Sequence, residues 1–421
     1  MQTQPSHFKI FAFTHPFSKQ DMKITKLTIA VVGGGNSAHV LIPFLSKNGH
    51  TVNLLTRRPK DWNDEIQCDI VRMDNTVKKT ITGHIHKKSS DPKKVIPEAD
   101  AIILCMPVHC YRNVLEHLAT YIDKNKEVFV GAIYGQAGFN LMFREIQNEF
   151  HLTKAVYFSF GLIPWICRAD KYGSHGLNYG GNQVNSVAVS PYDKFEKLYL
   201  LLLKDISHAR FVQADSFISL TLSVDNQIIH PSRCYALWQK YNGHWPALDD
   251  VPNFYSDFDD LSTEILSKVD SEYTLIRDGV KKLFPLHDFK YMMNYMDLEI
   301  FSNESKFKDI KSSFRDSPTL GLIKTPTVEL EDGTRMLDIH CRFFTDDIPY
   351  GLLIAKWIAC ELNIDTPMIN EIIQWSQQLR NEHWLHEDNS IDMDFCMSHK
   401  NVTGIPPAYG ITSVEQIVSL N

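Results

Sequence analysis

The sequence predicts an α/β domain built on a parallel sheet, followed by a mostly α-helical domain. In the first half, short apolar runs rich in β-branched residues alternate with amphipathic segments, which is typical of parallel strands joined by crossover helices. From about residue 192 onward, long helical periodicities replace this alternation. We place the domain boundary near residue 210, so that residues 24–210 form the first domain and residues 211–421 the second; residues 1–23 are an extension of unclear role.

The individual elements follow from the apolar pattern. In the first domain we expect helices at 36–49 and 111–121 and strands at 27–32, 51–56, 100–107, 127–135, 155–161 and 184–191, the last one completing the sheet. The polar stretch 60–97 suggests short strands and loops. Pro43 falls inside the first helix and should introduce a kink. In the second domain we expect short strands near 322–330 and 335–343 and helical runs at 192–205, 214–241, 259–282 and 350–363.

The turn after the first strand carries the spacing of a dinucleotide-binding Rossmann domain. Gly33-x-Gly35-x-x-Ala38 follows an apolar strand and opens a helix. Gly33 permits the tight turn, Gly35 lets the backbone approach a pyrophosphate, and Ala38 keeps the helix close to the sheet. Free N–H groups near Asn36 would face the phosphates. The alternative is a glycine-rich turn between a strand and a helix that binds no ligand.

The end of the second strand indicates which dinucleotide binds. NAD-selective sites usually carry an acidic residue about 20 residues beyond the first glycine, where it holds the ribose 2′-hydroxyl. Here Arg57 and Arg58 occupy that region, and no acid precedes Asp61. Arginine binds phosphate with a rigid fork of donors, so NADP(H) is favoured and NAD(H) remains possible. The alternative is a solvated basic turn.

Composition excludes several classes of protein. The net charge of −7 gives no reason to expect nucleic acid or an anionic membrane as partner. No apolar run reaches 18 residues, so no membrane span is expected. The 8 cysteines form no CxxC pair, which argues against a metal site or a disulfide framework and fits a reducing compartment such as the cytoplasm.

The second domain offers one histidine with catalytic potential. Asn226 and His230 are four residues apart and share a helix face, and Pro231 should bend the helix beside the histidine. The unperturbed pKa of histidine lies near neutrality, so His230 is a plausible acid/base. By itself, a core or surface role is the commoner one for a histidine, and the chain holds 18 of them.

A second cluster precedes the helical run at 350–363. Asp346 and Asp347 stand before Pro349, where either aspartate is a natural helix N-cap. Two adjacent acids permit two tasks, so that one caps while the other turns toward a histidine. Arg342, just upstream, has the donor geometry to hold a carboxylate bidentately.

Four motifs together resemble one enzyme family. GGGNSAH at 33–39, LIPWICR at 162–168, NQIIHP at 226–231 and DDIPYG at 346–351 occur in the order seen in the opine dehydrogenases, the octopine, nopaline, tauropine and alanopine type enzymes. The resemblance extends over about residues 24–400. It implies an N-terminal Rossmann domain and a helical substrate and catalytic domain, which join an amino acid to a 2-oxo acid, usually pyruvate, and reduce the product with NAD(P)H.

The resemblance also implies roles for particular residues. The catalytic histidine falls on His230, its partner aspartate on Asp347 and the substrate-carboxylate arginine on Arg342; Asn226 and Cys167 would also bind substrate. Asp347 would orient the imidazole and stabilise its cation. The chain departs from the family where Ser37 replaces a common glycine, at the basic end of the second strand and in its N-terminal extension. Small-molecule substrates and a monomer or homodimer are expected.

Alternative functions and the amine donor remain open. A ketopantoate- or glycerol-3-phosphate-type dehydrogenase would keep the fold but generally uses a lysine as proton donor, and a non-catalytic dinucleotide-binding protein would lack an acid/base pair. In arginine-using members of the family an acid just before the LPW-type motif meets the guanidinium. The matching stretch 159–165 holds no acid, so we expect short neutral amines to be better donors than arginine.

Overall fold

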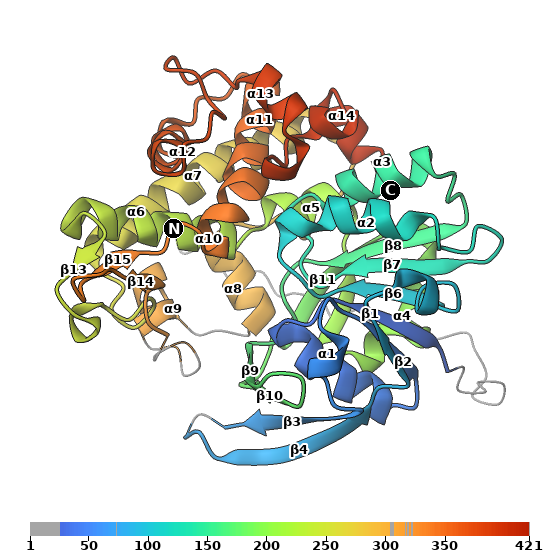
Figure 1. Cartoon of the computed structure of the whole chain (residues 1–421). Coiled ribbons are helices and arrows are strands. Elements are labelled where there is room, and N and C mark those ends of the chain that lie inside the picture. Colours follow the sequence, from blue (N-terminus) through green and yellow to red (C-terminus); the bar gives the residue numbers. More distant parts are fainter. Residues whose placement is uncertain are drawn as a thin grey trace, which may run out of the picture.

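The chain folds into an α/β part followed by a mostly helical part, as the sequence predicts (Figure 1). The computed structural model describes residues 26–72, 74–303, 307–315 and 323–420 and the single residues 317 and 320. The N-terminal extension therefore lies outside the described residues.

An eight-stranded sheet forms the centre of the α/β part. Its strand order is β12-β11-β8-β7-β6-β1-β2-β5, and the strands are β1 (Thr28–Val32), β2 (Thr51–Leu55), β5 (Lys87–Ser89), β6 (Ala101–Leu104), β7 (Val128–Ala132), β8 (Ala155–Phe160), β11 (Val184–Ser190) and β12 (Arg210–Gln213). All neighbours from β5 to β8 in this order run parallel, but β11 is antiparallel to β8. The expectation that 184–191 completes a parallel sheet was wrong, because β11 reverses direction and β12 pairs beyond it.

A second, four-stranded sheet covers α1 (Asn36–Lys47) on the side away from the main sheet (Figure 1). Its order is β4-β3-β10-β9, with β3 (Glu65–Val71), β4 (Val77–His84), β9 (Cys167–Lys171) and β10 (His175–Asn178). The sheet packs tightly on the helix, since a Cβ on Gly83 would lie 2.5 Å from Pro43 Cα. The sequence suggested only short strands at 60–97, because the outward residues of β4 are charged or polar and mask its alternation.

Both faces of the main sheet are buried. Ile29 and Val31 of β1 belong to the core beneath α1, whereas Ala30 and Val32 belong to a larger core that continues into the helical part. The helices on that face are α2 (Tyr111–Ala119) and α3 (Phe139–Glu149), and α4 (Phe195–Leu201) leads to the edge strand β12. This continuous core fixes the helical part against the carboxyl ends of the strands.

The helical part is built around the long helices α6 and α7. Its helices are α5 (Phe217–Leu222), α6 (Asn226–Tyr241), α7 (Asp260–Leu283), α8 (Tyr295–Asn303), α9 (Ile310–Arg315), α10 (Arg342–Thr345), α11 (Leu353–Glu361), α12 (Pro367–Arg380), α13 (Met393–Ser398) and α14 (Val414–Val418). A small sheet of order β13-β15-β14 joins β13 (His244–Trp245), β14 (Thr327–Glu329) and β15 (Arg335–Leu337). The run expected at 214–241 is interrupted between α5 and α6, so His230 lies in the second turn of α6. Among the described residues, no helix is long and apolar enough to cross a membrane.

Candidate active site

The glycine turn has the shape that a pyrophosphate requires. Gly33 has a φ of +106°, and a Cβ there would lie 2.5 Å from the carbonyl oxygen of Cys105. Gly35 forms the N-cap of α1 and is exposed together with Asn36, whereas Ala38 is fully buried against the sheet. The first turn of α1 therefore presents its N–H groups at an open surface, which fits a dinucleotide phosphate.

Arg57 and Arg58 follow β2 and are both exposed. The Arg58 guanidinium carbon lies 4.2 Å from the centre of the Tyr172 ring, and its Nε lies 3.6 Å from Asp61 Oδ2. The two arginines give this end of the sheet a positive charge, as a ribose 2′-phosphate requires, although Asp61 offsets part of it.

Cys167 and Asn36 meet at the same turn. Cys167 begins β9, and its Sγ lies 3.9 Å from Ser37 Oγ in the first turn of α1. Asn36 Oδ1 accepts a hydrogen bond from the Ala169 N–H at 2.9 Å. The structure thus brings Cys167 to the first turn of α1, next to the glycine turn. Asn226, by contrast, begins α6 one turn before His230 and is half-buried.

His230 and Asp347 form a fully buried pair. His230 Nδ1 lies 2.7 Å from Asp347 Oδ2, and neither side chain is exposed to solvent. His230 Nε2 lies 2.9 Å from the Tyr255 hydroxyl. The imidazole stacks on the Phe343 ring at 3.7 Å between centres and meets Phe254 edge-on at 5.6 Å. The ring is therefore fixed by packing and by a partner at each nitrogen.

The electrostatics of this pair favour a neutral histidine at rest. Burial lowers the pKa of His230 well below its usual value, and the nearby charge of Arg342 lowers it further. Burial raises the pKa of Asp347, whereas Arg342 acts in the opposite direction. With a neutral ring, Nδ1–H donates to Asp347 and Nε2 accepts from Tyr255. In this arrangement Nε2 is the nitrogen that can accept a proton, and Asp347 lies where a carboxylate can stabilise an imidazolium.

Arg342 lies near this pair, since its charge acts on both His230 and Asp347. Its side chain is exposed to solvent. Partial burial by the surrounding protein lowers the pKa of Arg342, but the negative charge of Asp347 acts in the opposite direction, and the pKa lies above its usual value. Its positive charge also acts on Asp225 and Cys167. Within the part of the chain that the structure describes, its guanidinium makes no hydrogen bond or ion pair. Arg342 can therefore bind an external anion.

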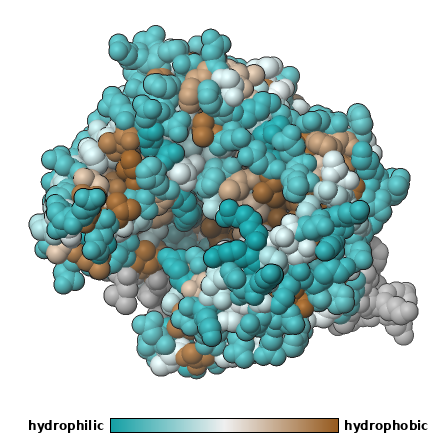
Figure 2. All heavy atoms as spheres, in the orientation of Figure 1, coloured by the Kyte–Doolittle hydropathy of each residue, from teal (hydrophilic) through white to brown (hydrophobic). Residues whose placement is uncertain are grey.

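In the space-filling view, the surface is hollowed between the helical part and the α/β part, with hydrophobic side chains in the wall (Figure 2). The carboxyl ends of the main strands and the segment that carries Arg342 and Asp347 both border this region (Figure 1).

Asp346 connects the helical part to the α/β part through its side chain. Its carboxylate accepts hydrogen bonds from the N–H groups of Val108 at 3.0 Å and His109 at 3.4 Å, and lies 2.5 Å from His109 Nδ1. Asp346 raises the pKa of His109 to about 10. The expectation that Asp346 or Asp347 caps the following helix was wrong, because neither makes a cap hydrogen bond there. Asp346 instead caps the short turn that follows β6.

Three residues that contact the candidate site residues were not predicted from the sequence. Tyr255 and Tyr172 lie far along the chain from the groups that they contact, and no motif marks them. His109 carries a signal that went unused, since it lies just beyond the carboxyl end of β6, where open α/β sheets bind ligands.

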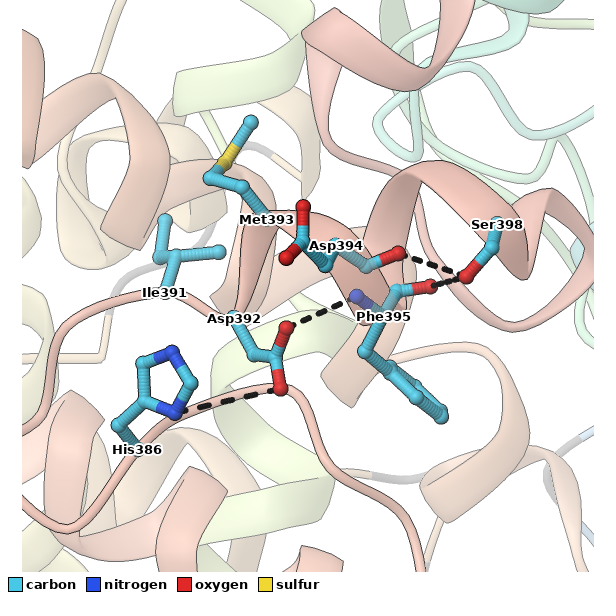
Figure 3. Close-up of a pocket in the computed structure, with 7 residues that line it drawn as sticks. All are labelled: His386, Ile391, Asp392, Met393, Asp394, Phe395 and Ser398. Atoms are coloured by element: carbon cyan, nitrogen blue, oxygen red, sulfur yellow. Dashed lines mark hydrogen bonds and ion pairs between the residues drawn. The ribbon is translucent and has the colours of Figure 1, made fainter.

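A separate surface pocket of about 500 Å³ lies in the C-terminal region (Figure 3). Asp392 caps α13 there by accepting from the Phe395 N–H at 2.8 Å, so its polar groups serve local structure. None of its lining residues belongs to the His230 site; they are His386, Ile391, Asp392, Met393, Asp394, Phe395 and Ser398.

Comparisons with known proteins agree for both parts of the chain. Residues 213–380 match the family described as NAD/NADP octopine/nopaline dehydrogenase, alpha-helical domain, and residues 28–159 match the N-terminus of NAD-dependent glycerol-3-phosphate dehydrogenase. The chain is 26% identical to an opine dehydrogenase of Haliotis discus hannai, covering 94% of this chain and 99% of the relative. It is 25% identical to a tauropine dehydrogenase of Arabella iricolor, covering 93% and 100%.

The fold agrees as well. A solved structure of octopine dehydrogenase with NADH and L-arginine superposes with a TM-score of 0.77 at 21% identity, covering 94% of this chain and 98% of that one. The fold and the two matched regions lead to one conclusion: the chain is an NAD(P)-dependent oxidoreductase that is similar to the opine dehydrogenases.

Proposed function

We propose that this protein joins an amino acid or similar amine to a 2-oxo acid such as pyruvate and reduces the product to an opine. The observation that carries the proposal is the buried His230–Asp347 pair beside Arg342, whose guanidinium makes no ion pair with any described residue. The relatives named as opine, octopine and tauropine dehydrogenases support this reaction class.

Each residue of this group has a chemical task in the proposed reaction. Arg342 holds the carboxylate of the oxo acid and so orients its carbonyl. The amine adds to the carbonyl, and His230 takes up and returns protons while the carbinolamine loses water to form an imine. Because Nε2 faces the Tyr255 hydroxyl, protons pass through or beside Tyr255. Asp347 keeps Nδ1 protonated and stabilises the imidazolium.

The dinucleotide supplies the hydride that reduces the imine. Gly33, Gly35, Asn36 and Ala38 form the turn that holds its pyrophosphate, and the free N–H groups of α1 supply the hydrogen bonds. Arg57 and Arg58 favour NADP(H) over NAD(H), because a 2′-phosphate adds two negative charges at the end of β2. Cys167, next to Ser37, and Asn226, next to His230, border the space between cofactor and substrate.

The proposed reaction has a direct test. NADPH oxidation in the presence of pyruvate should require an added amine, and mass spectrometry should find a secondary-amine dicarboxylate. A ketopantoate-type reductase would instead oxidise NADPH with the oxo acid alone, and a non-catalytic protein would bind NADPH without turnover.

The same assay tests the role of Arg342. Arg342→Met should raise the KM of the oxo acid at least tenfold more than the KM of NADPH, since a charge-assisted bidentate contact is worth roughly 1.5–3 kcal/mol. A larger rise in the KM of NADPH than in that of the oxo acid would assign Arg342 to the phosphates of the dinucleotide. Arg342 acts on Cys167, and Cys167 lies next to Ser37 in the first turn of α1.

We further propose that residues 24–210 and 211–421 act as the cofactor and substrate domains of a cytoplasmic monomer or homodimer. The end of β12 at Gln213 supports a boundary in this region. Light scattering after gel filtration measures the mass of the particle, and a mass above that of a dimer would contradict the proposal.

A further inference from the structure

Tyr172 occupies the tip of the hairpin that joins β9 to β10 and lies over the end of β2. One face of its ring carries the Arg58 guanidinium, whose carbon lies 4.2 Å from the ring centre. Its hydroxyl lies at the glycine turn, because a Cβ on Gly34 would be only 2.9 Å from that oxygen. Tyr172 thus contacts both the phosphate-binding turn and the basic end of β2.

The hairpin tip is held firmly from several directions. The Gly173 N–H donates to His39 Nε2 at 2.7 Å, and the Gly173 carbonyl accepts from the Asn63 N–H at 2.9 Å. Because Nε2 is an acceptor, His39 Nδ1 donates to the Gly35 carbonyl, 2.9 Å away. This histidine therefore connects the backbone of the hairpin tip directly to the N-cap of α1.

Aromatic packing completes the support of the tyrosine ring. His39 meets the Tyr172 ring edge-on at 5.5 Å between centres, and buried Trp62 does so at 5.7 Å. Gly173 has a φ of +72°, and a Cβ there would lie 1.9 Å from the Asp61 carbonyl oxygen, so the tip abuts the chain after β2. The four-stranded sheet thereby supplies a rigid wall beside the end of β2.

Apart from the Tyr172 ring, little restricts the Arg58 side chain. Its side chain is 62% exposed, and its partner Asp61 is 49% exposed with 3.6 Å between the charged atoms. An exposed ion pair of this length holds a long side chain weakly. The Tyr172 ring restricts the plane of the guanidinium while its N–H edge remains open to a ligand.

We infer that Tyr172 is a positioning residue for NADP(H) selectivity: it holds Arg58 flat, with its donors ready for the phosphate on the adenosine ribose. This inference rests on the proposed preference for NADP(H). It assigns a cofactor role to the second sheet, which lies outside the Rossmann strands, and it requires the ring of Tyr172 rather than its hydroxyl.

Equilibrium binding tests the inference without any turnover. Dissociation constants for NADPH and NADH are measured by fluorescence titration of the purified protein. Tyr172→Ala should weaken NADPH binding roughly five- to tenfold and NADH binding less than about twofold, because NADH lacks the phosphate that Arg58 contacts. Tyr172→Phe should bind both dinucleotides as the wild type does. An unchanged NADH constant also shows that the hairpin is folded.

Two further variants separate positioning from general packing. In an Arg58→Met background, Tyr172→Ala should add almost nothing to the loss of NADPH affinity, since the tyrosine acts through the arginine. Tyr241→Ala is the matched control, because the Tyr241 ring also contacts a cation, with Lys240 Nζ 5.2 Å from its centre, but lies far from the glycine turn. It should change neither dissociation constant.

The outcomes distinguish this inference from the proposal on which it rests. Equal losses of NADPH and NADH affinity in Tyr172→Ala, or a full effect that persists without Arg58, would reduce Tyr172 to a packing residue and overturn the inference. A wild-type protein that binds NADH as tightly as NADPH would refute the NADP(H) preference itself. Loss of amine-dependent turnover alone would bear only on the proposed reaction.

Discussion

At the scale of single residues, the site combines groups that local sequence identifies with groups that it cannot. His230 is one of 18 histidines, and only the joint presence of four motifs singles it out. Asp347 and Asp346 are neighbours in sequence with different partners, since Asp347 binds His230 and Asp346 binds His109 of the α/β part. Tyr255 could not be predicted, because its contact with His230 arises from tertiary packing alone.

We expect His230 and Asp347 to act as one unit. His230→Gln should lower kcat by about 10²–10⁴-fold, the usual contribution of general acid–base catalysis. Asp347→Asn should cost a comparable amount, because it disturbs the tautomer and the stabilisation of the imidazolium. The double variant should be little worse than the worse single one. Steady-state kinetics give these values.

Controls for this prediction address folding and the role of the carboxylate. NADPH affinity and the thermal midpoint show whether the variants are folded, since removal of one partner of a buried pair can destabilise the protein. Full activity in Asp347→Asn would contradict the unit and leave Tyr255 as the main partner of the histidine.

At the scale of elements, the turn after β6 and the segment around Asp347 meet across the two parts of the molecule. A single π-helical turn, Ile348–Leu352, follows Asp347 and precedes α11, and such turns often occur at functional sites. The sequence correctly placed a helix after Pro349. It could not show that N–H donors of the turn at 108–110 would lie closer to Asp346 than those of its own helix.

The His109–Asp346 pair should make stability depend on pH in a defined direction. In the folded protein Asp346 raises the pKa of His109 to about 10, whereas a histidine in the unfolded chain has a pKa of about 6.5. The pair therefore stabilises the fold fully below about pH 6.5, and this contribution is lost as the pH rises toward the folded pKa. Compared with His109→Gln, the wild type should be more stable at pH 6 and nearly equal at pH 10.

Urea denaturation at several pH values measures this difference. His117→Gln, which changes an exposed histidine on the neighbouring helix α2, provides the matched control and should show no such convergence with the wild type. A stability gap between wild type and His109→Gln that stays constant from pH 6 to pH 10 would show that the histidine is neutral in the pair.

At the scale of the whole molecule, the sequence predicted the architecture because apolar periodicity records burial. The alternation of strands and helices and the later helical runs correspond to the two parts of the fold. The direction of β11 and the pairing of β12 were not predictable, because hydrophobic pattern carries no information on strand polarity. The chain finally returns to the main sheet, where the Tyr157 hydroxyl donates to the Leu420 carbonyl at 2.7 Å.

The proposed reaction needs an amine donor, and the charged groups near Arg342 bear on which amine is used. The stretch 159–165 contributes no carboxylate, and Ser159 and Trp165 in it are buried. Asp225 lies near Arg342 in the helical part, but burial raises its pKa, and this disfavours its charged form. A guanidinium placed among these groups would lose hydration without a strong partner.

We therefore expect alanine, glycine or taurine to give a higher kcat/KM than arginine when pyruvate is held constant. The difference should be at least about tenfold, since an imperfectly paired buried charge costs several kcal/mol. NADPH absorbance in an amine-by-oxo-acid screen measures it, and the other oxo acids in the screen show whether the order of amines depends on pyruvate.

A clear preference for arginine would contradict the prediction. It would direct attention to Asp225, whose Oδ1 lacks a hydrogen-bond partner among the described residues. Asp225→Asn should then abolish turnover of arginine while sparing that of alanine, because only the guanidinium needs the carboxylate.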